Sequence, residues 1–188
     1  MKKIVLSVLL ATAMLGSYNE VKAAAGKGAQ LTVYKLAIPG KPWALEIAVS
    51  PQYSSVKQFE TEKSFYLQNK KTDISILATL EKASDDGDAI AAREYYTKKK
   101  SMGGLQAEDI KQYEIGDAAV REYMIKDSRF KALGGDALVV RNLNYYLSHD
   151  GYWAEIQISK LRYQPFDKKL FDEVLGNIKI VPLERGSL

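Results

Sequence analysis

The sequence contains no cysteine and a single histidine, His149. Without cysteine the chain has no disulfide, no thiolate metal site and no thiol nucleophile, so its stability depends on packing. A single histidine excludes a metal site built from several imidazoles. Because His149 stands beside Asp150-Gly151, a pair typical of tight turns, we interpret it as a solvated turn residue. No metal site and no cofactor are predicted.

Long apolar runs are also missing, apart from a short one near the N-terminus. A Lys-Lys pair precedes an uncharged apolar stretch at residues 4–16, and small residues follow at Val21 and Ala23. This order predicts a secretory signal peptide at residues 1–23, cleaved after Ala23. The alternative is an uncleaved anchor, but the apolar run is shorter than the roughly 20 residues that span a bilayer.

The missing cysteine also bears on location. A lipid-anchored export signal needs a cysteine at its cleavage point, so we expect no direct membrane anchor. A compact leader that begins with lysine is typical of bacterial export rather than of an organelle transit peptide. The chain is therefore expected to be periplasmic or secreted.

The chain has only a small excess of positive over negative charge. The full chain has 27 lysines and arginines and 23 acids, which gives a formal net charge of +4. The leader contains Lys2, Lys3, Lys22 and Glu20, so its removal lowers the net charge to +2. Nucleic-acid binding needs a clustered basic face, and no nucleic-acid partner is predicted. The remaining length of about 165 residues fits one domain.

After the leader, the chain divides into a flexible lead-in at 24–30, one domain at 31–182 and a tail at 183–188. Alternation of apolar residues and turn signals predict a domain composed mostly of strands. The expected strands are 31–38, 43–49, 64–68, 74–81, 109–115, 118–126, 178–181 and the two arms of a hairpin at 137–161. Helices are expected at 88–102 and between Gln164 and Asn177. Because short turns join adjacent strands, we predict a mainly antiparallel sheet with helices packed against it, an α+β domain.

The best-defined local unit is the hairpin around Asp150-Gly151, since these residues tolerate the positive φ angles of a two-residue turn. Pairing across this turn gives three apolar pairs: Leu147 with Ala154, Tyr145 with Ile156, and Leu143 with Ile158. Side chains of alternate residues share one face of a strand, so we expect this face in the core.

The opposite face of the same hairpin is polar and carries two aromatic residues. Tyrosine and tryptophan combine a large apolar area with a polar group, which suits recognition surfaces. We therefore predict a binding surface formed by Tyr146, Trp153, Asn144 and Glu155. The alternative is that a helix or a loop covers this face, so that the two aromatic side chains are packed beneath it.

Three aspartates, Asp85, Asp86 and Asp88, surround Gly87 ahead of the first expected helix. A calcium loop would need further ligands at fixed positions, including a closing glutamate, and the sequence lacks them. Short acidic side chains accept the free amide hydrogens at a helix start. We therefore interpret this segment as a capping loop.

Four segments carry a family resemblance: Ile38-Pro39-Gly40-Lys41-Pro42-Trp43, Ile74-Ser75-Ile76, Gly151-Tyr152-Trp153, and Phe171-Asp172-Glu173-Val174-Leu175-Gly176-Asn177-Ile178. Together they resemble the PsbP/DcrB-like superfamily, which includes a photosystem extrinsic subunit, bacterial periplasmic proteins and a nuclear Ran-binding factor. The resemblance covers residues 31–182 and implies an α/β/α sandwich around an antiparallel sheet. It also implies a binding, assembly or accessory role without catalysis. The missing cysteine departs from the lipoprotein members, and no functional residue carries over.

We therefore expect an exported, non-catalytic binding or accessory protein. Its partner would be a protein of the cell envelope or outside the cell, engaged through a sheet face. Two alternatives stay open: a hydrolase that uses carboxylates, and a carrier of a small apolar ligand. Two carboxylates that converge in a deep cleft would favour the hydrolase, whereas an enclosed apolar cavity between sheet and helix would favour the carrier.

Overall fold

The computed structural model describes residues 21–22, 30–56, 61, 63–99, 106–127 and 138–183. Its larger sheet has seven strands in the order β4-β5-β6-β10-β9-β8-β7. Their bounds are β4 Ser54–Ser55, β5 Ser64–Asn69, β6 Ile74–Lys82, β7 Ala107–Ile115, β8 Ala118–Asp127, β9 Leu138–His149 and β10 Tyr152–Leu161. All neighbouring strands of this sheet pair antiparallel, as predicted.

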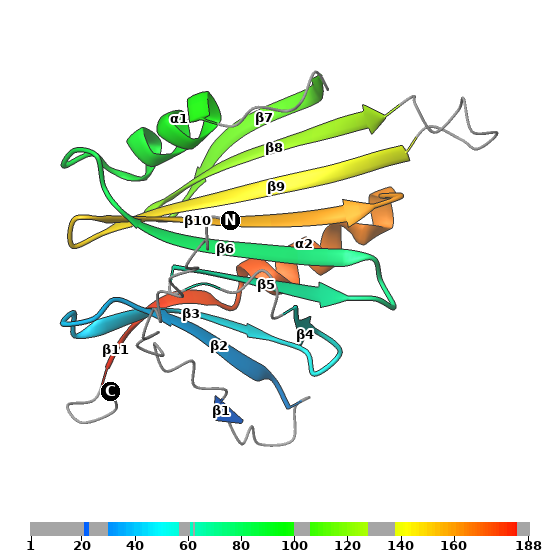
Figure 1. Ribbon diagram of the computed structural model, residues 1–188. Helices are drawn as coiled ribbons and strands as arrows, with labels where there is room; N and C mark the ends of the chain where they lie inside the picture. The colour runs from blue at the N-terminus through cyan, green and yellow to red at the C-terminus, as the bar shows by residue number, and fades with distance from the viewer. Residues whose placement is uncertain are drawn as a thin grey trace, which may run out of the picture.

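A smaller sheet has four strands in the order β1-β2-β3-β11. Their bounds are β1 Val21–Lys22, β2 Thr32–Ala37, β3 Trp43–Val49 and β11 Ile178–Pro182. These pairings are antiparallel too. Strands from the two ends of the described chain therefore lie together in one sheet (Figure 1).

Different elements cover the two faces of the seven-stranded sheet. The helix α1, Ala89–Lys99, packs on β8, β9 and β10 (Figure 1). The small sheet and the helix α2, Lys168–Leu175, pack on the opposite face, and a 3-10 turn at Pro165–Asp167 leads into α2. The result is the predicted α+β domain, in which one outer layer combines a small sheet with a helix.

The main core lies between the two sheets. In β6 the alternate residues Ile74, Ile76, Ala78 and Leu80 are at most 2% exposed, which confirms the predicted apolar face. The small sheet contributes Leu45 and Ile47 to this core, and α2 contributes Phe171 and Val174. Each large aliphatic side chain buried in this way stabilises the fold by about 1.5–3 kcal/mol.

The β9–β10 hairpin has the predicted register. Leu147 lies opposite Ala154, Tyr145 opposite Ile156 and Leu143 opposite Ile158. The turn residues Asp150 and Gly151 have φ angles of 49° and 75°, as a type I′ turn requires. His149 is exposed beside this turn, as expected, with its ring edge-on to that of Trp43 at 4.9 Å between centroids.

The division of the strands into two sheets was not predicted from the sequence. The segment at 43–49 was expected as a strand and is one, but periodicity does not tell with which strand it pairs. The two-residue strand β4 was not predicted either, since it is too short to show a period. The expected helix at 88–102 is described as α1 up to Lys99, and the next residues lie outside the described part.

The predicted leader, lead-in and tail lie largely outside the described residues. The exceptions are β1, which falls within the predicted leader, and two single residues, Gln30 and Leu183. Within the part of the chain that the structure describes, no helix is long and apolar enough to cross a membrane.

Candidate functional site

The face predicted to bind a partner is covered by α1. Tyr146, Asn144, Trp153 and Glu155 do lie on one face of β9 and β10, as the hairpin register requires. However, Tyr146 and Asn144 are 0% exposed, Trp153 is 2% exposed and Glu155 is 6% exposed. The prediction that these four residues form an accessible surface is therefore wrong, and the alternative of a covering helix describes the structure.

Aromatic stacking holds α1 on this face. The ring of Tyr96 on α1 stacks on that of Tyr146 at 5.9 Å, and the ring of Tyr95 lies 5.3 Å from that of Trp153. Small residues such as Ala92 let the helix approach the sheet closely. Burial raises the pKa of the Tyr146 and Tyr96 hydroxyls, so both stay protonated. These contacts form a second, smaller core.

Several polar side chains beneath α1 pair with one another. The side-chain amide of Asn144 donates to the Tyr146 hydroxyl at 3.0 Å and to the Glu155 carboxylate at 2.8 Å. Farther along, the Ser159 hydroxyl donates to the Asn142 side-chain oxygen at 2.7 Å. Buried polar groups need such partners, so these side chains help to define the packing of α1 on the sheet.

The acidic loop ahead of α1 is a capping loop, as interpreted from the sequence. The Asp88 carboxylate accepts the amide hydrogens of Ile90 and Ala91 at 2.9 and 3.0 Å, which satisfies free donors of the first helical turn. The Asp85 carboxylate accepts the Gly87 amide at 2.8 Å. Among the described residues there is no group of three or more histidine or acidic side chains placed to hold a metal ion.

A pocket of about 440 Å³ lies between this loop and the β7–β8 turn. Four carboxylates line it, those of Asp86, Asp88, Glu114 and Asp117, together with glycines, alanines, Ile90 and Ser148. No lysine or arginine occurs among the described residues of the lining. The pocket therefore suits a cationic group and does not suit an apolar ligand.

The β7 end of the large sheet is its most exposed part. β7 is the last strand in the described order, and all of its residues after Ala107 are exposed. Three of them are large and apolar: Ile110 is 51% exposed, Ile115 is 43% exposed and Tyr113 is 36% exposed. The small sheet and α2 pack against other strands and leave these side chains in contact with solvent.

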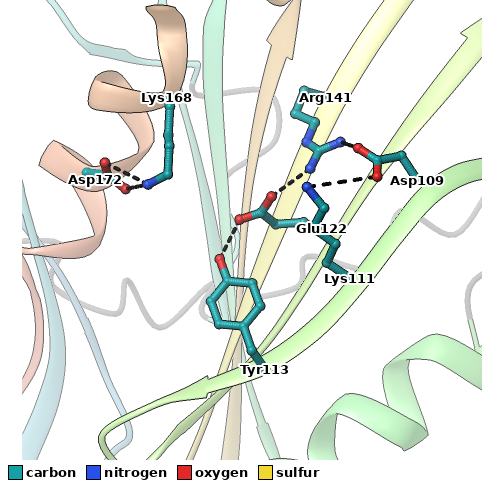
Figure 2. A network of polar contacts seen from close by, with 7 residues as sticks. All are labelled: Asp109, Lys111, Tyr113, Glu122, Arg141, Lys168 and Asp172. Carbon is teal, nitrogen blue, oxygen red and sulfur yellow. Dashed lines mark hydrogen bonds and ion pairs between the residues drawn. The ribbon is translucent and has the colours of Figure 1, made fainter. Parts of the chain in front are cut away.

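A network of ion pairs centred on Arg141 adjoins this exposed end (Figure 2). The Arg141 guanidinium lies 2.5 Å from the Asp109 carboxylate of β7 and 2.7 Å from the Glu122 carboxylate of β8. The Tyr113 hydroxyl donates to Glu122 from the solvent side. Three neighbouring strands are thus joined through side chains as well as through their main chains.

Electrostatics keep this network charged. The hydrogen bond from Arg141 lowers the pKa of Asp109. Burial alone would lower the pKa of Arg141, but the hydrogen bonds to Glu122 and Asp109 outweigh it and raise that pKa. Burial and the hydrogen bond to Glu122 raise the pKa of Tyr113, which stays a neutral donor. The arrangement therefore places fixed charges of both signs on three neighbouring strands.

Comparison with known proteins shows what the fold is. No family model matches the sequence, and no curated protein matches it. Among solved structures, PsbP (CyanoP) from Synechocystis sp. PCC 6803 superposes with a TM-score of 0.52 at 16% sequence identity. The match covers 85% of this chain and 98% of that one. The chain has the PsbP-like fold.

A second solved structure matches the PsbP-like domain less closely. The Ran-binding protein Mog1p from Saccharomyces cerevisiae gives a TM-score of 0.47 at 12% identity, covering 87% of this chain and 96% of that one. The resemblance predicted from diffuse hydrophobic segments is confirmed at the level of the fold.

The sequence analysis did not predict that β7 would lie at the end of the large sheet of the PsbP-like domain with exposed apolar side chains. The segment at 109–115 was expected as a strand, but its position at the end of the sheet depends on long-range pairing. One signal was present: the charged residues Glu108, Asp109, Lys111 and Glu114 are interspersed with apolar ones, so that neither face of the strand is fully apolar. Charged side chains of this kind are typical of edge strands.

Proposed function

We propose that this PsbP-like protein is an exported, non-catalytic accessory protein that binds a protein partner through the β7 end of its large sheet. The observation that supports the proposal is the exposure of Ile110, Tyr113 and Ile115 on the terminal strand of a seven-stranded sheet. Exposed apolar side chains on the terminal strand of a sheet favour association with another chain. The predicted leader would deliver the protein to the periplasm or to the outside of the cell.

The two other functions considered from the sequence receive less support. The acidic pocket is unsuited to a small apolar ligand, so a carrier role is not favoured. For a hydrolase the pocket would have to supply an acid and a base. Asp88, one of its carboxylates, is already engaged in capping α1. Neither alternative is favoured by a specific observation, whereas the exposed strand favours binding.

Site-specific photo-crosslinking tests the proposal. A photoreactive amino acid replaces Ile115 in the full chain, expressed in the organism of origin, and the cross-linked products are identified by mass spectrometry. Lys70, which is exposed in the turn between β5 and β6, serves as the matched control position. We expect one protein to be captured at Ile115 and not at Lys70. Equal capture at the two positions, or none at Ile115, would refute the proposal.

A further inference from the structure

The main chain of β7 presents an ordered set of hydrogen-bonding groups. The two-residue turn Gly116-Asp117 joins β7 to β8, with Ile115 opposite Ala118. Residues that flank such a turn hydrogen-bond to each other, and bonding then alternates along the ladder. The main-chain groups of Tyr113 therefore face β8, whereas those of Gln112 and Glu114 face away from it.

We propose that a partner protein adds an extended, basic segment to β7 as a further strand of the sheet. The inference rests on the proposed function, because it specifies how the β7 end engages its partner. Strand addition satisfies the outward main-chain groups and lets alternate side chains of the partner contact the sheet. It needs no change in the positions of β7 and β8.

A β-bulge sets the length of this site. The register between β7 and β8 shifts between Glu108 and Lys111, and Asp109 has a φ angle of 48°. Arg141 holds the Asp109 carboxylate at 2.5 Å and so fixes the position of the bulge. Because a bulge bends a strand and interrupts regular pairing, the regular run is confined to 111–115. That run fits a partner strand of about five residues.

The side chains of this run favour apolar residues in the partner. Tyr113 and Ile115 point to the same face as Val120 and Ala118, their partners on β8. On a new strand, side chains opposite Tyr113 and Ile115 would extend this apolar row. A valine or isoleucine at every second position of the partner would cover both exposed side chains.

Charge favours basic residues at the other positions. Glu114 lies on the opposite face from Tyr113 and lines the acidic pocket together with Asp86 and Asp117. The described lining contains no lysine or arginine that would neutralise these acids. A lysine of the added strand opposite or beside Glu114 would reach this pocket, and an acidic strand would be repelled.

A synthetic peptide tests this inference on the full chain. The probe is a fluorescein-labelled peptide of alternating valine and lysine, about eight residues long, and its control is the alternating valine and glutamate peptide. We expect the basic peptide to bind and the acidic peptide not to bind. In hydrogen exchange, the basic peptide should slow exchange of the Gln112 and Glu114 amides and leave that of Tyr113 unchanged.

Variants of β7 separate strand pairing from simple charge attraction. Gln112→Pro removes an outward amide hydrogen, which an edge strand tolerates, while Gln112→Ala keeps it. We expect the proline variant to lose peptide binding and the alanine variant to retain it. The double variant Glu114→Lys, Asp117→Lys should bind about tenfold more weakly. Glu173→Lys, at an exposed acid of α2, is the matched control and should bind normally.

Several outcomes would overturn the inference. One is peptide binding that leaves the exchange of the Gln112 and Glu114 amides unchanged, a result that is decisive even if Gln112→Pro does not fold. Another is protection of both amides that rises with protein concentration without peptide, since a second copy of the chain would then occupy β7. If cross-linking at Ile115 captures a protein but Gln112→Pro leaves that capture intact, the proposed function stands and strand addition is wrong.

Discussion

The guanidinium of Arg141 on β9 lies 2.7 Å from the carboxylate of Glu122 on β8, although the two residues are not opposite each other. In the strand register Arg141 faces Met124, so Glu122 is its diagonal neighbour. Only 6% of the Arg141 side chain is exposed, compared with 66% for Lys168 in its ion pair with Asp172 (Figure 2). Since exposure to water weakens an ion pair, these two pairs should differ greatly in their effect on stability.

We expect Arg141→Met to lower the free energy of unfolding by about 3 kcal/mol, because it leaves the carboxylate of Glu122 partly buried without its partner. Lys168→Met, at the exposed pair, should change it by less than about 0.5 kcal/mol. Adding Glu122→Leu to Arg141→Met should restore most of the loss, since the unpaired charge is then removed. Urea unfolding of the four proteins measures these differences. Similar losses for Arg141→Met and Lys168→Met would contradict the assignment of a structural ion pair.

Local sequence pattern was sufficient to predict the β9–β10 hairpin. The turn residues Asp150-Gly151 fix the register, and the register decides which residues share a face. The pattern also placed Tyr146 and Trp153 together on the polar face. The sequence pattern could not show that α1 covers these two residues, because the helix has no strongly apolar side from which a buried contact could be predicted.

The candidate site at β7 depends on contacts between distant segments. Asp109 and Arg141 are separated by 32 positions in the chain, and no local pattern links them. Likewise, the place of β7 at the end of the sheet follows from the pairing of β8 with β9. The fold class follows from local periodicity, whereas the exposed surface follows from the order of strands.

Gly87 should not tolerate a side chain. A Cβ atom there would lie 2.4 Å from the Ala91 Cβ and 2.6 Å from the Asp85 carboxylate, so the loop or α1 would have to move. The Gly87 carbonyl also accepts hydrogen bonds from Trp153 and Ser148, both at 3.0 Å. We expect Gly87→Ala to lower the free energy of unfolding by about 1–3 kcal/mol in urea denaturation.

Gly176→Ala is the matched control for this change. Gly176 has an ordinary helical φ angle of −64°, and a Cβ atom there would meet nothing closer than 3.4 Å. Its replacement should leave the stability unchanged or raise it by a few tenths of a kcal/mol. If Gly87→Ala proves as stable as Gly176→Ala, the loop at Gly87 is not packed against α1 as closely as these contacts indicate.

Export should remove the leader after Ala23. Mass spectrometry of the exported protein should give a chain that begins at Ala24, because small residues at positions 21 and 23 form the expected cleavage site. Ala23→Tyr should block processing, and Ala24→Tyr, one residue beyond the cut, is the control that should still be processed. Cleavage here would also remove β1 and leave β2 as the edge of the small sheet. An exported chain that retains residues 1–23 would show that the prediction is wrong.

The carboxylate of Asp150, in the β9–β10 turn of the large sheet, binds Lys41 and Trp43 at the small sheet, and this contact should depend on pH. The carboxylate lies 2.8 Å from the Lys41 ammonium and accepts the indole hydrogen of Trp43 at 3.1 Å. The hydrogen bond from Lys41 lowers the pKa of the Asp150 carboxyl most, and the hydrogen bond from Trp43 lowers it further. An aspartate with a lowered pKa stabilises the folded state above the unfolded-state pKa of about 3.9, and this contribution is lost as the pH falls through the folded-state pKa.

We therefore expect the Tm of the wild-type protein to fall more steeply than that of Asp150→Asn as the pH is lowered from about 5 to about 2. Asparagine tolerates the positive φ angle of 49° at this position and can still accept the Trp43 hydrogen, so the turn is kept. At neutral pH the variant should be slightly less stable, because the attraction to Lys41 is gone. Asp172→Asn, at an exposed pair within α2, is the control for the general effect of removing an acid. Parallel Tm curves for the wild type and Asp150→Asn would mean that Lys41 and Trp43 do not hold this carboxylate in solution.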